Sequence, residues 1–250
     1  LFRGNSLSQG VASGSLVEKP KLLWKFHVKD GAFEGTPAVV DGVVYIADLD
    51  GTLFALRLDN GKKTWEYKIE GGFIASPAVH QKRVYVGDYD GNFYCVDATN
   101  GKALWAFKTQ AEIDASANFY KDKVLIGSQD ATLYCLDAAD GTLAWKHEIA
   151  DQIRCSPTIV GNRCFLAGCD GRLHIIDIDE GKAVSDVELD GPTGVTPAVL
   201  GDRVFFGTEG GVFFAIDWRK AEIAWKYADA ETALPFRSSA AVTKGIVLVG

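Results

Sequence analysis

The stretch from Ser76 to Thr109 reads SPAVHQKRVYVGDYDGNFYCVDATNGKALWAFKT. Apolar and polar residues alternate over residues 83–87 and 92–97, and Asx-Gly pairs stand at Asp90-Gly91 and Asn100-Gly101. Glycine accepts a positive φ angle without a steric clash, so these pairs favour tight turns between antiparallel strands. The stretch therefore predicts four short strands, at residues 76–79, 83–87, 92–97 and 102–109.

This four-strand unit recurs along the chain with a period of about 40 residues. A serine or threonine opens each copy, at Thr36, Ser76, Ser116, Ser156, Thr196 and Ser239. A tryptophan recurs near the end of the copies, at Trp24, Trp65, Trp105, Trp145 and Trp225. A single small sheet cannot bury both of its faces, so such units must stack on one another. The pattern predicts an all-β propeller of four-stranded antiparallel blades, with five complete blades plus partial blades at both ends.

We expect two parts: a leader at residues 1–21 lying over the propeller, and the propeller domain at residues 22–250. Residues 22–28 match the fourth strand of later repeats but lack the three strands before it. The missing strands either are supplied by residues 239–250 or lie in sequence outside this chain. Because the chain lacks methionine and ends within a strand pattern, we expect it to be a fragment, incomplete at its C-terminus.

The composition excludes some classes of partner. Lys and Arg total 26 against 33 Asp and Glu, for a net charge of −7, and the basic residues form no run. Nucleic acid is therefore a poor partner. No apolar run is long enough to cross a membrane as a helix. The five cysteines form no Cys-x-x-Cys pair; we expect them to be small buried side chains, with a disulfide among Cys155, Cys164 and Cys169 as the alternative.

The sequence offers no catalytic or metal-binding constellation. Asp48-Leu-Asp50-Gly51 and Asp88-Tyr-Asp90-Gly91 resemble calcium loops, but the bidentate glutamate such loops need is absent, so we interpret both as hairpin turns. The histidines stand at unrelated repeat positions, and no hydrolase, zinc or nucleotide-binding motif occurs. We predict no catalytic residue and no metal site. Carboxylates brought together from distant blades remain an open alternative.

Two eleven-residue stretches carry a family resemblance. They are CVDATNGKALW, from Cys95 to Trp105, and CLDAADGTLAW, from Cys135 to Trp145. Both resemble the tryptophan-docking motif of the pyrroloquinoline-quinone (PQQ) repeat, and the units are similar to the PQQ-like propeller family that includes the outer-membrane assembly lipoprotein BamB. The resemblance implies an eight-bladed parent, a role in binding proteins, and a place in the bacterial cell envelope or periplasm.

The same resemblance leaves an enzymatic alternative, a quinoprotein dehydrogenase with PQQ and Ca²⁺ as cofactors. Members of that kind add an adjacent Cys-Cys pair and a calcium site with a catalytic Asp. This chain has no Cys-Cys pair, and its blades lack long insertions. We therefore expect a non-enzymatic binding scaffold without a cofactor.

Two sets of residues are assigned roles. The five recurring tryptophans are predicted to close each blade and pack on its neighbour, because a large rigid ring buries much apolar area. Two residues before each inner strand the repeat abandons its residue type, with Glu34, Ile74, Asp114, Arg154, Gly194 and Arg237. Variable loops on a rigid frame are typical of recognition surfaces. We predict a polypeptide partner at this mouth of the channel, bound by Glu34, Asp114, Arg154 and Arg237 with apolar contacts from Phe33, Phe73 and Phe236.

Overall fold

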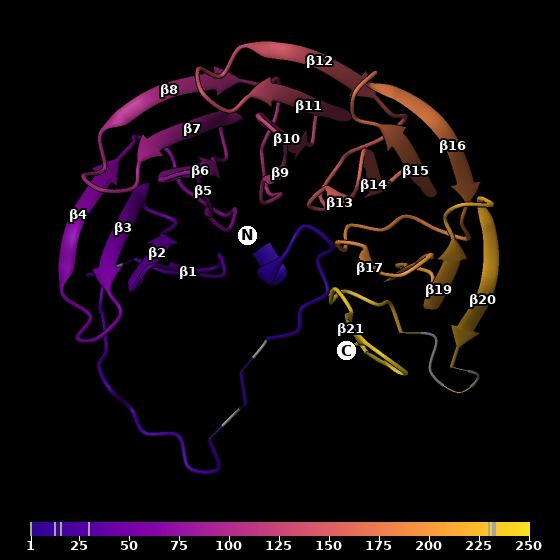
Figure 1. The fold of residues 1–250 in the computed structure, drawn as a ribbon, viewed down its shortest axis with the longest axis horizontal. Helices are drawn as coiled ribbons and strands as arrows, with labels where there is room; N and C mark the ends of the chain where they lie inside the picture. Colours follow the sequence, from indigo (N-terminus) through magenta and orange to yellow (C-terminus); the bar gives the residue numbers. More distant parts are fainter. Residues whose placement is uncertain (1, 13, 16, 30, 230, 232–233) are drawn as a thin grey trace.

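The computed structural model describes residues 2–12, 14–15, 17–29, 31–229, 231 and 234–250. Among these residues the strands form five four-stranded antiparallel sheets and one two-stranded sheet. The helical content there is one 3-10 turn, η1 (Phe2–Gly4). The sheets stand around one axis as the blades of a propeller that is open on one side (Figure 1). The prediction of an all-β propeller is confirmed.

The strand bounds repeat from blade to blade. Blade 1 contains β1 (Ala38–Val40), β2 (Val43–Ala47), β3 (Thr52–Arg57) and β4 (Lys63–Lys68). Blade 2 contains β5 (Ala78–His80), β6 (Arg83–Gly87), β7 (Asn92–Asp97) and β8 (Ala103–Lys108). Blade 3 contains β9 (Asn118–Tyr120), β10 (Lys123–Ser128), β11 (Thr132–Asp137) and β12 (Leu143–Glu148).

The remaining blades follow the same plan. Blade 4 contains β13 (Thr158–Val160), β14 (Arg163–Ala167), β15 (Arg172–Asp177) and β16 (Lys182–Glu188). Blade 5 contains β17 (Ala198–Leu200), β18 (Arg203–Gly207), β19 (Val212–Asp217) and β20 (Glu222–Ala228). The two-stranded sheet contains β21 (Ala241–Thr243) and β22 (Ile246–Leu248).

Each blade is a meander whose first strand lies nearest the axis and whose fourth strand lies at the rim (Figure 1). The inner strands are shorter than the sequence predicted. Residues 36 and 37 of blade 1, for example, precede β1 instead of belonging to it, and residues 116 and 117, which include no proline, precede β9 in the same way. Because the chain reverses direction at each turn of the meander, the β1–β2 and β3–β4 hairpins lie at one face of the propeller. The β2–β3 hairpin and the connections between blades lie at the other face.

The apolar core lies between adjacent blades. On β6, the side chain of Tyr85 belongs to the cluster shared with blade 3, whereas Val84 and Val86 belong to the cluster shared with blade 1. All three are buried. This alternation follows from the period of two along a strand. Each blade thus stabilises both neighbours through the two faces of the same strand.

Trp65, Trp105 and Trp145 each dock on the next blade. The indole Nε1 of Trp65 donates to the carbonyl of Ala98 at 3.0 Å, and Trp105 repeats the contact with Ala138 at 3.3 Å. Gly141 has a φ of +76°, and a Cβ atom there would lie 2.6 Å from Cε3 of Trp105. The glycine is therefore needed twice, for its backbone angle and for the ring that covers it.

One pair of blades replaces this contact. Ser185 of blade 4 stands where other blades carry tryptophan, and Ala221 of blade 5 stands where the other blades carry glycine. Trp218 packs instead against Phe165, with ring centroids 5.6 Å apart, and Ala221 packs against the same apolar cluster. Since no indole covers position 221, a Cβ atom fits there. The loss of the tryptophan at Ser185 is thus compensated in the next blade by Trp218 and Ala221. We call these three changes a compensated substitution.

The two sides of the opening differ. Residues 22–28 form no strand and do not pair with β21 or β22. Trp24 nevertheless donates to the carbonyl of Leu58 at 2.8 Å, which is the docking contact of the repeat. On the other side of the opening, Trp225 is 45% exposed. Its indole Nε1 donates to no acceptor among the described residues. The number of blades in a complete ring remains a prediction.

Candidate functional site

The axial channel holds a segment of the chain itself. Residues 2–9 lie at the centre of the arc of blades (Figure 1). The carbonyl of Ser6 accepts from the amide of Ile159 at 2.8 Å, and that of Leu7 accepts from Val199 at 2.9 Å. The carbonyl of Gln9 accepts from Val242 at 2.9 Å. Three successive inner strands, β13, β17 and β21, thus each donate one backbone N–H to the segment. We call residues 2–9 the axial segment.

Side chains fix the axial segment further. Asn118 donates through Nδ2 to the carbonyl of Ser6 at 3.0 Å, and the hydroxyl of Thr158, which donates to the carbonyl of Pro197, accepts from the hydroxyl of Ser8 at 3.0 Å. Ser8 is 2% exposed. The expectation of a leader that lies over the propeller is therefore wrong for these residues. The sequence held a signal for the contact: Asn118 and Thr158 are polar where Ala38, Ala78 and Ala198 stand in the other blades.

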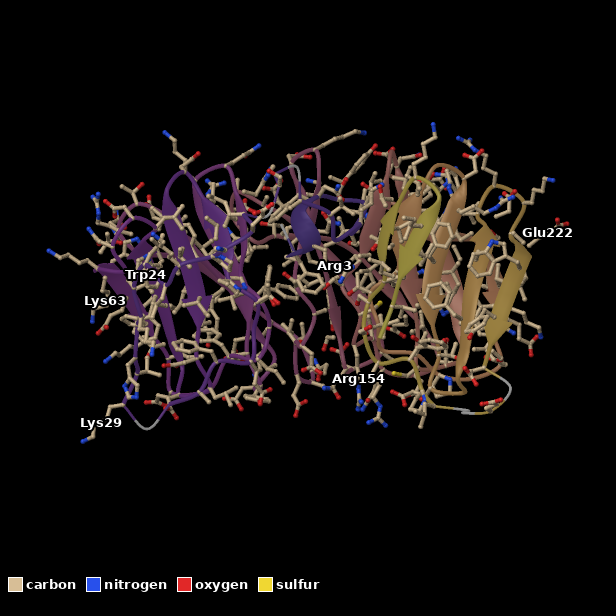
Figure 2. All side chains as sticks on the ribbon, turned by 90° about the horizontal axis from the view of Figure 1, so that it is seen from below. Arg3, Trp24, Lys29, Lys63, Arg154 and Glu222 are labelled. Carbon is tan, nitrogen blue, oxygen red and sulfur yellow. The ribbon has the colours of Figure 1, made fainter. Side chains whose placement is uncertain are left out.

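Arg3 ties the axial segment to the last sheet. Its Nε donates to the carbonyl of Ser8 at 3.0 Å, and its Nη2 donates to the carbonyl of Ala240. Burial lowers the pKa of the Arg3 guanidinium. Figure 2 shows Arg3 in the middle of the molecule and Arg154 at its lower edge. The mouth with Arg154 is thus separate from the part of the channel that Arg3 occupies.

One side of the mouth is acidic. Gln129 Nε2 donates at 2.7 Å both to Glu112 Oε2 and to Asp114 Oδ2, while Asp114 Oδ1 is buried without a hydrogen-bond partner. Burial raises the pKa of Asp114, and the negative charge of Glu112 adds to the effect. The pKa of Tyr89 is raised by desolvation and by Glu34, Asp114 and Glu112. The negative charges of Glu34, Glu112 and Asp114 are therefore all close enough to influence the hydroxyl of Tyr89.

The other side of the mouth is basic. Arg154 is exposed, and its guanidinium donates to Gln152 Oε1 at 2.8 and 3.1 Å. Its aliphatic stem lies over Gly194, where a Cβ atom would be 3.3 Å from Cβ of Arg154. Arg237 pairs with Glu209 at 3.3 Å, and both side chains are exposed. The four charged residues predicted from sequence thus lie on loops of one face, with the acidic ones on blades 1 to 3.

The predicted apolar contacts are wrong in part. Phe73 is fully buried in the core between blades 1 and 2, so it cannot contact a partner. Phe33 and Phe236 are half-buried against Phe54 and Phe213. The reason is that this repeat position fills the space between blades; a Cβ on Gly207 would lie 2.2 Å from Phe236. The sequence analysis missed the exposed apolar residues of this face, Tyr89 and Leu234. Ala233, which precedes Leu234 in the loop between β20 and β21, lies outside the described residues.

The other polar candidates have structural contacts. Asp88 Oδ1 accepts from the amide of Asn92 at 2.7 Å, which makes its segment a hairpin turn, as predicted. His174 lies between Asp170 and Asp186, with nitrogen–oxygen distances of 3.0 and 3.2 Å. Among the described residues no cluster of His, Cys, Asp and Glu is arranged to hold a metal ion.

The cysteines form no disulfide. Four of the five free thiols are buried and Cys169 is half-buried. Burial raises the pKa of Cys95 and of Cys135 to about 12, so these thiols stay protonated at neutral pH. The interpretation as small buried side chains is confirmed for Cys95, Cys135, Cys155 and Cys164.

Comparisons with known proteins agree on the fold. The family model described as outer membrane protein assembly factor BamB matches residues 16–156, 95–184 and 129–250. The crystal structure of BamB from Moraxella catarrhalis is similar, with a TM-score of 0.72 and 22% identity over 79% of this chain and 65% of that chain. This chain therefore spans about two thirds of the length of that BamB. No curated protein sequence matches the chain.

Two further solved structures share the fold. The computationally designed Ika8 protein gives a TM-score of 0.78 and 18% identity, over 91% of this chain and 70% of that chain. The quinohemoprotein alcohol dehydrogenase ADHIIG from Pseudomonas putida HK5 gives 0.68 and 18%, over 86% of this chain and 46% of that chain. These identities show a common fold and no more. None of the described residues forms a helix that could span a membrane.

The axial cavity can be tested for the quinone cofactor that the repeat implies. A cavity of about 430 Å³ is lined by residues 2–4 of the axial segment, residues 36–40, Ser76 and Pro77. The charged side chain in this lining is Arg3, whose guanidinium already donates to two backbone carbonyls. PQQ carries several carboxylates, which need cationic or amide partners on burial. The described residues of this cavity do not fit PQQ.

Proposed function

The chain belongs to the family of the outer membrane protein assembly factor BamB, and we propose that it is a non-enzymatic propeller that binds a polypeptide partner. The observation that carries the proposal is the binding of the axial segment. Inner strands hold this turned peptide segment through one backbone donor each, at 2.8 to 2.9 Å. Main-chain hydrogen bonds of this kind give affinity that does not depend on the side chains of the bound peptide.

The mouth would supply the specificity. Its acidic side on blades 1 to 3, together with Arg154 and the ion pair of Arg237 with Glu209 on the other side, forms an uneven charge pattern. Complementary charge patterns select partners and reject those of the wrong sign. The family relation also supports a place in the bacterial cell envelope, which fractionation of cells that make the full-length protein would test.

The likeness to the alcohol dehydrogenase supports no second function. It concerns the fold, and the axial cavity does not fit the quinone. Non-enzymatic binding is therefore the function that we put to the test.

Charge reversal at the mouth tests the proposal. We expect Arg154→Glu/Arg237→Glu to reduce capture of the partner from envelope extracts at least about tenfold, because both charges face the bound partner. Lys102→Glu is the matched control, since Lys102 is exposed in the β7–β8 turn at the opposite face. Undiminished capture by the double variant, with unchanged thermal stability, would refute the mouth as the binding surface.

A further inference from the structure

A pocket lies between blades 1 and 2, at the face opposite the mouth. Its volume is about 640 Å³, and its lining includes Val43, Tyr45 and Trp65 of blade 1 with Lys82 and Ala98 of blade 2. It opens beside the β1–β2 and β5–β6 turns. Its role is therefore independent of the proposed function at the mouth. We call it the interblade pocket.

In the next pair of blades this space is filled. There the guanidinium Nη1 of Arg83 donates to the carbonyl of Ala138 at 3.3 Å. The hydroxyl of Tyr85 and the indole of Trp105 donate to the same oxygen, at 3.0 and 3.3 Å. An arginine side chain of the chain itself thus fills the space between blades 2 and 3.

The interblade pocket keeps this arrangement but lacks the arginine. The hydroxyl of Tyr45 and the indole of Trp65 donate to the carbonyl of Ala98 at 3.2 and 3.0 Å. Position 43, which is equivalent to Arg83, is valine. The pocket is consequently the empty copy of a site that holds a guanidinium one blade further on.

The carboxylate that pairs with the basic residue of this position in other blades is also replaced in blade 1. In blades 3 to 5 a Lys or Arg at the start of the second strand pairs with an Asp at the end of the third, as Lys123 does with Asp137 at 3.1 Å. In blade 1 the Asp position is Arg57, which turns outward to pair with Asp59 at 2.6 Å. Both halves of the intrachain pair are thus absent from blade 1.

The surroundings of the interblade pocket still favour a cation. The rings of Tyr45 and Trp65 lie at an angle of 44°, with centroids 5.8 Å apart, and aromatic faces attract guanidinium groups. The pKa of Tyr45 is raised by burial first and then by the charges of Asp41 and Asp97, so both carboxylates act on the pocket. The positive charge of Lys82 would repel a bound cation, but Lys82 lies at the exposed rim of the interblade pocket.

We propose that the interblade pocket binds an arginine side chain of a partner polypeptide in the place that Arg83 occupies between blades 2 and 3. A volume of about 640 Å³ is ample for one guanidinium and leaves room for the residues on either side of the arginine. The guanidinium lies beside the packed rings of Tyr45 and Trp65, near the carbonyl of Ala98, with Asp41 at the rim.

The test uses the tripeptide acetyl-Gly-Arg-Gly-amide as a probe. Its binding is followed through the indole Nε1–H resonance of Trp65 in ¹H–¹⁵N spectra, assigned with Trp65→Phe. We expect saturable shifts with a dissociation constant of about 1 mM or tighter. The same tripeptide with neutral citrulline should bind at least about tenfold more weakly. No shift of Trp65, or equal shifts with citrulline, would overturn the proposal.

Three variants locate the site. Val43→Arg/Arg57→Asp restores the intrachain pair of the other blades and should abolish the shifts while the spectrum stays dispersed. Lys82→Glu should tighten binding about two- to fivefold, and Asp41→Asn should weaken it by a similar factor, because both lie at the exposed rim. Since rim changes leave the core intact, unchanged affinity in both would refute the pocket even if the double variant failed to fold. Free arginine amide binding as tightly as the tripeptide would overturn the assignment to a polypeptide.

Discussion

Replacing Gly141 by alanine tests the docking of one blade on the next. The residue has a φ of +76°, and its added Cβ would lie 2.6 Å from Cε3 of Trp105. A positive φ costs alanine about 1–2 kcal/mol, and the forced displacement of a packed ring costs about 1–3 kcal/mol more. We therefore expect Gly141→Ala to lower the free energy of unfolding by about 2–5 kcal/mol.

Gly201→Ala is the matched control. Gly201 has a φ of +60°, and a Cβ there would have no neighbour within 4 Å, so only the backbone cost of about 1–2 kcal/mol applies. Urea denaturation followed by far-UV circular dichroism measures both variants, with the comparison valid where the m-value is unchanged. Equal losses in Gly141→Ala and Gly201→Ala would refute the close packing of the indole on the glycine.

A double variant extends the test. Trp105→Ser alone should cost about 3–5 kcal/mol through the cavity that it leaves. Combined with Gly141→Ala, it copies the natural pair Ser185 and Ala221. Because the ring is gone, the added methyl group meets no clash, and the double variant should be more stable than the sum of the single losses by about 1–3 kcal/mol. Strict additivity would contradict the compensated substitution described above.

Three shorter predictions concern other residues. Cys169 should react first with a thiol reagent in the folded protein, as read by mass spectrometry, because the other four thiols are buried. Burial raises the pKa of Asp114, so its ionised form destabilises the fold; Asp114→Asn should raise the melting temperature at pH 7, with a gain that shrinks as the pH falls to about 4. Arg3→Gln removes the charged contact to Ala240 and should speed hydrogen exchange at Val242 before other amides.

The repeat made the fold predictable. Asx-Gly turns, alternating strands and a constant period each pointed to the same four-strand unit, and their agreement over five copies left little room for another fold. The inner strands begin two residues later than predicted, with proline before them, as at Pro37, and without it, as at Ala117. Such a shift changes the assignment of strand ends and not the architecture.

The axial segment could not be placed from sequence. Its contacts join Ser6 to Asn118 and Ser8 to Thr158, which are 112 and 150 residues apart. No local pattern encodes pairs so distant, because periodicity reports on neighbours along one element. The polar residues on β9 and β13 marked one end of each contact, but nothing in the leader marked the other.

The error at Phe73 has a different cause. The position three residues before each inner strand carries Phe73, Ile113, Ile153, Thr193 or Phe236, and this mixture hid a common role between blades. Four of these side chains, all but Phe236, are buried, so the position shares burial across blades and not residue type or size. At the position beside it Glu34, Arg154 and Arg237 are exposed, whereas Asp114 is half-buried; that these residues bind a partner stays a prediction.

Deviations from the repeat therefore fall into two kinds. Where the fold needs a contact, a change in one blade is answered by a change in the next, as Ser185 is answered by Ala221 and Trp218. At the interblade pocket, Val43 removes a side chain, and the space of about 640 Å³ beside it stays open. Compensation indicates that stability was preserved within the chain. A space left open beside two aromatic rings and a backbone carbonyl indicates that its occupant comes from another molecule, which is why we assign the interblade pocket to a partner.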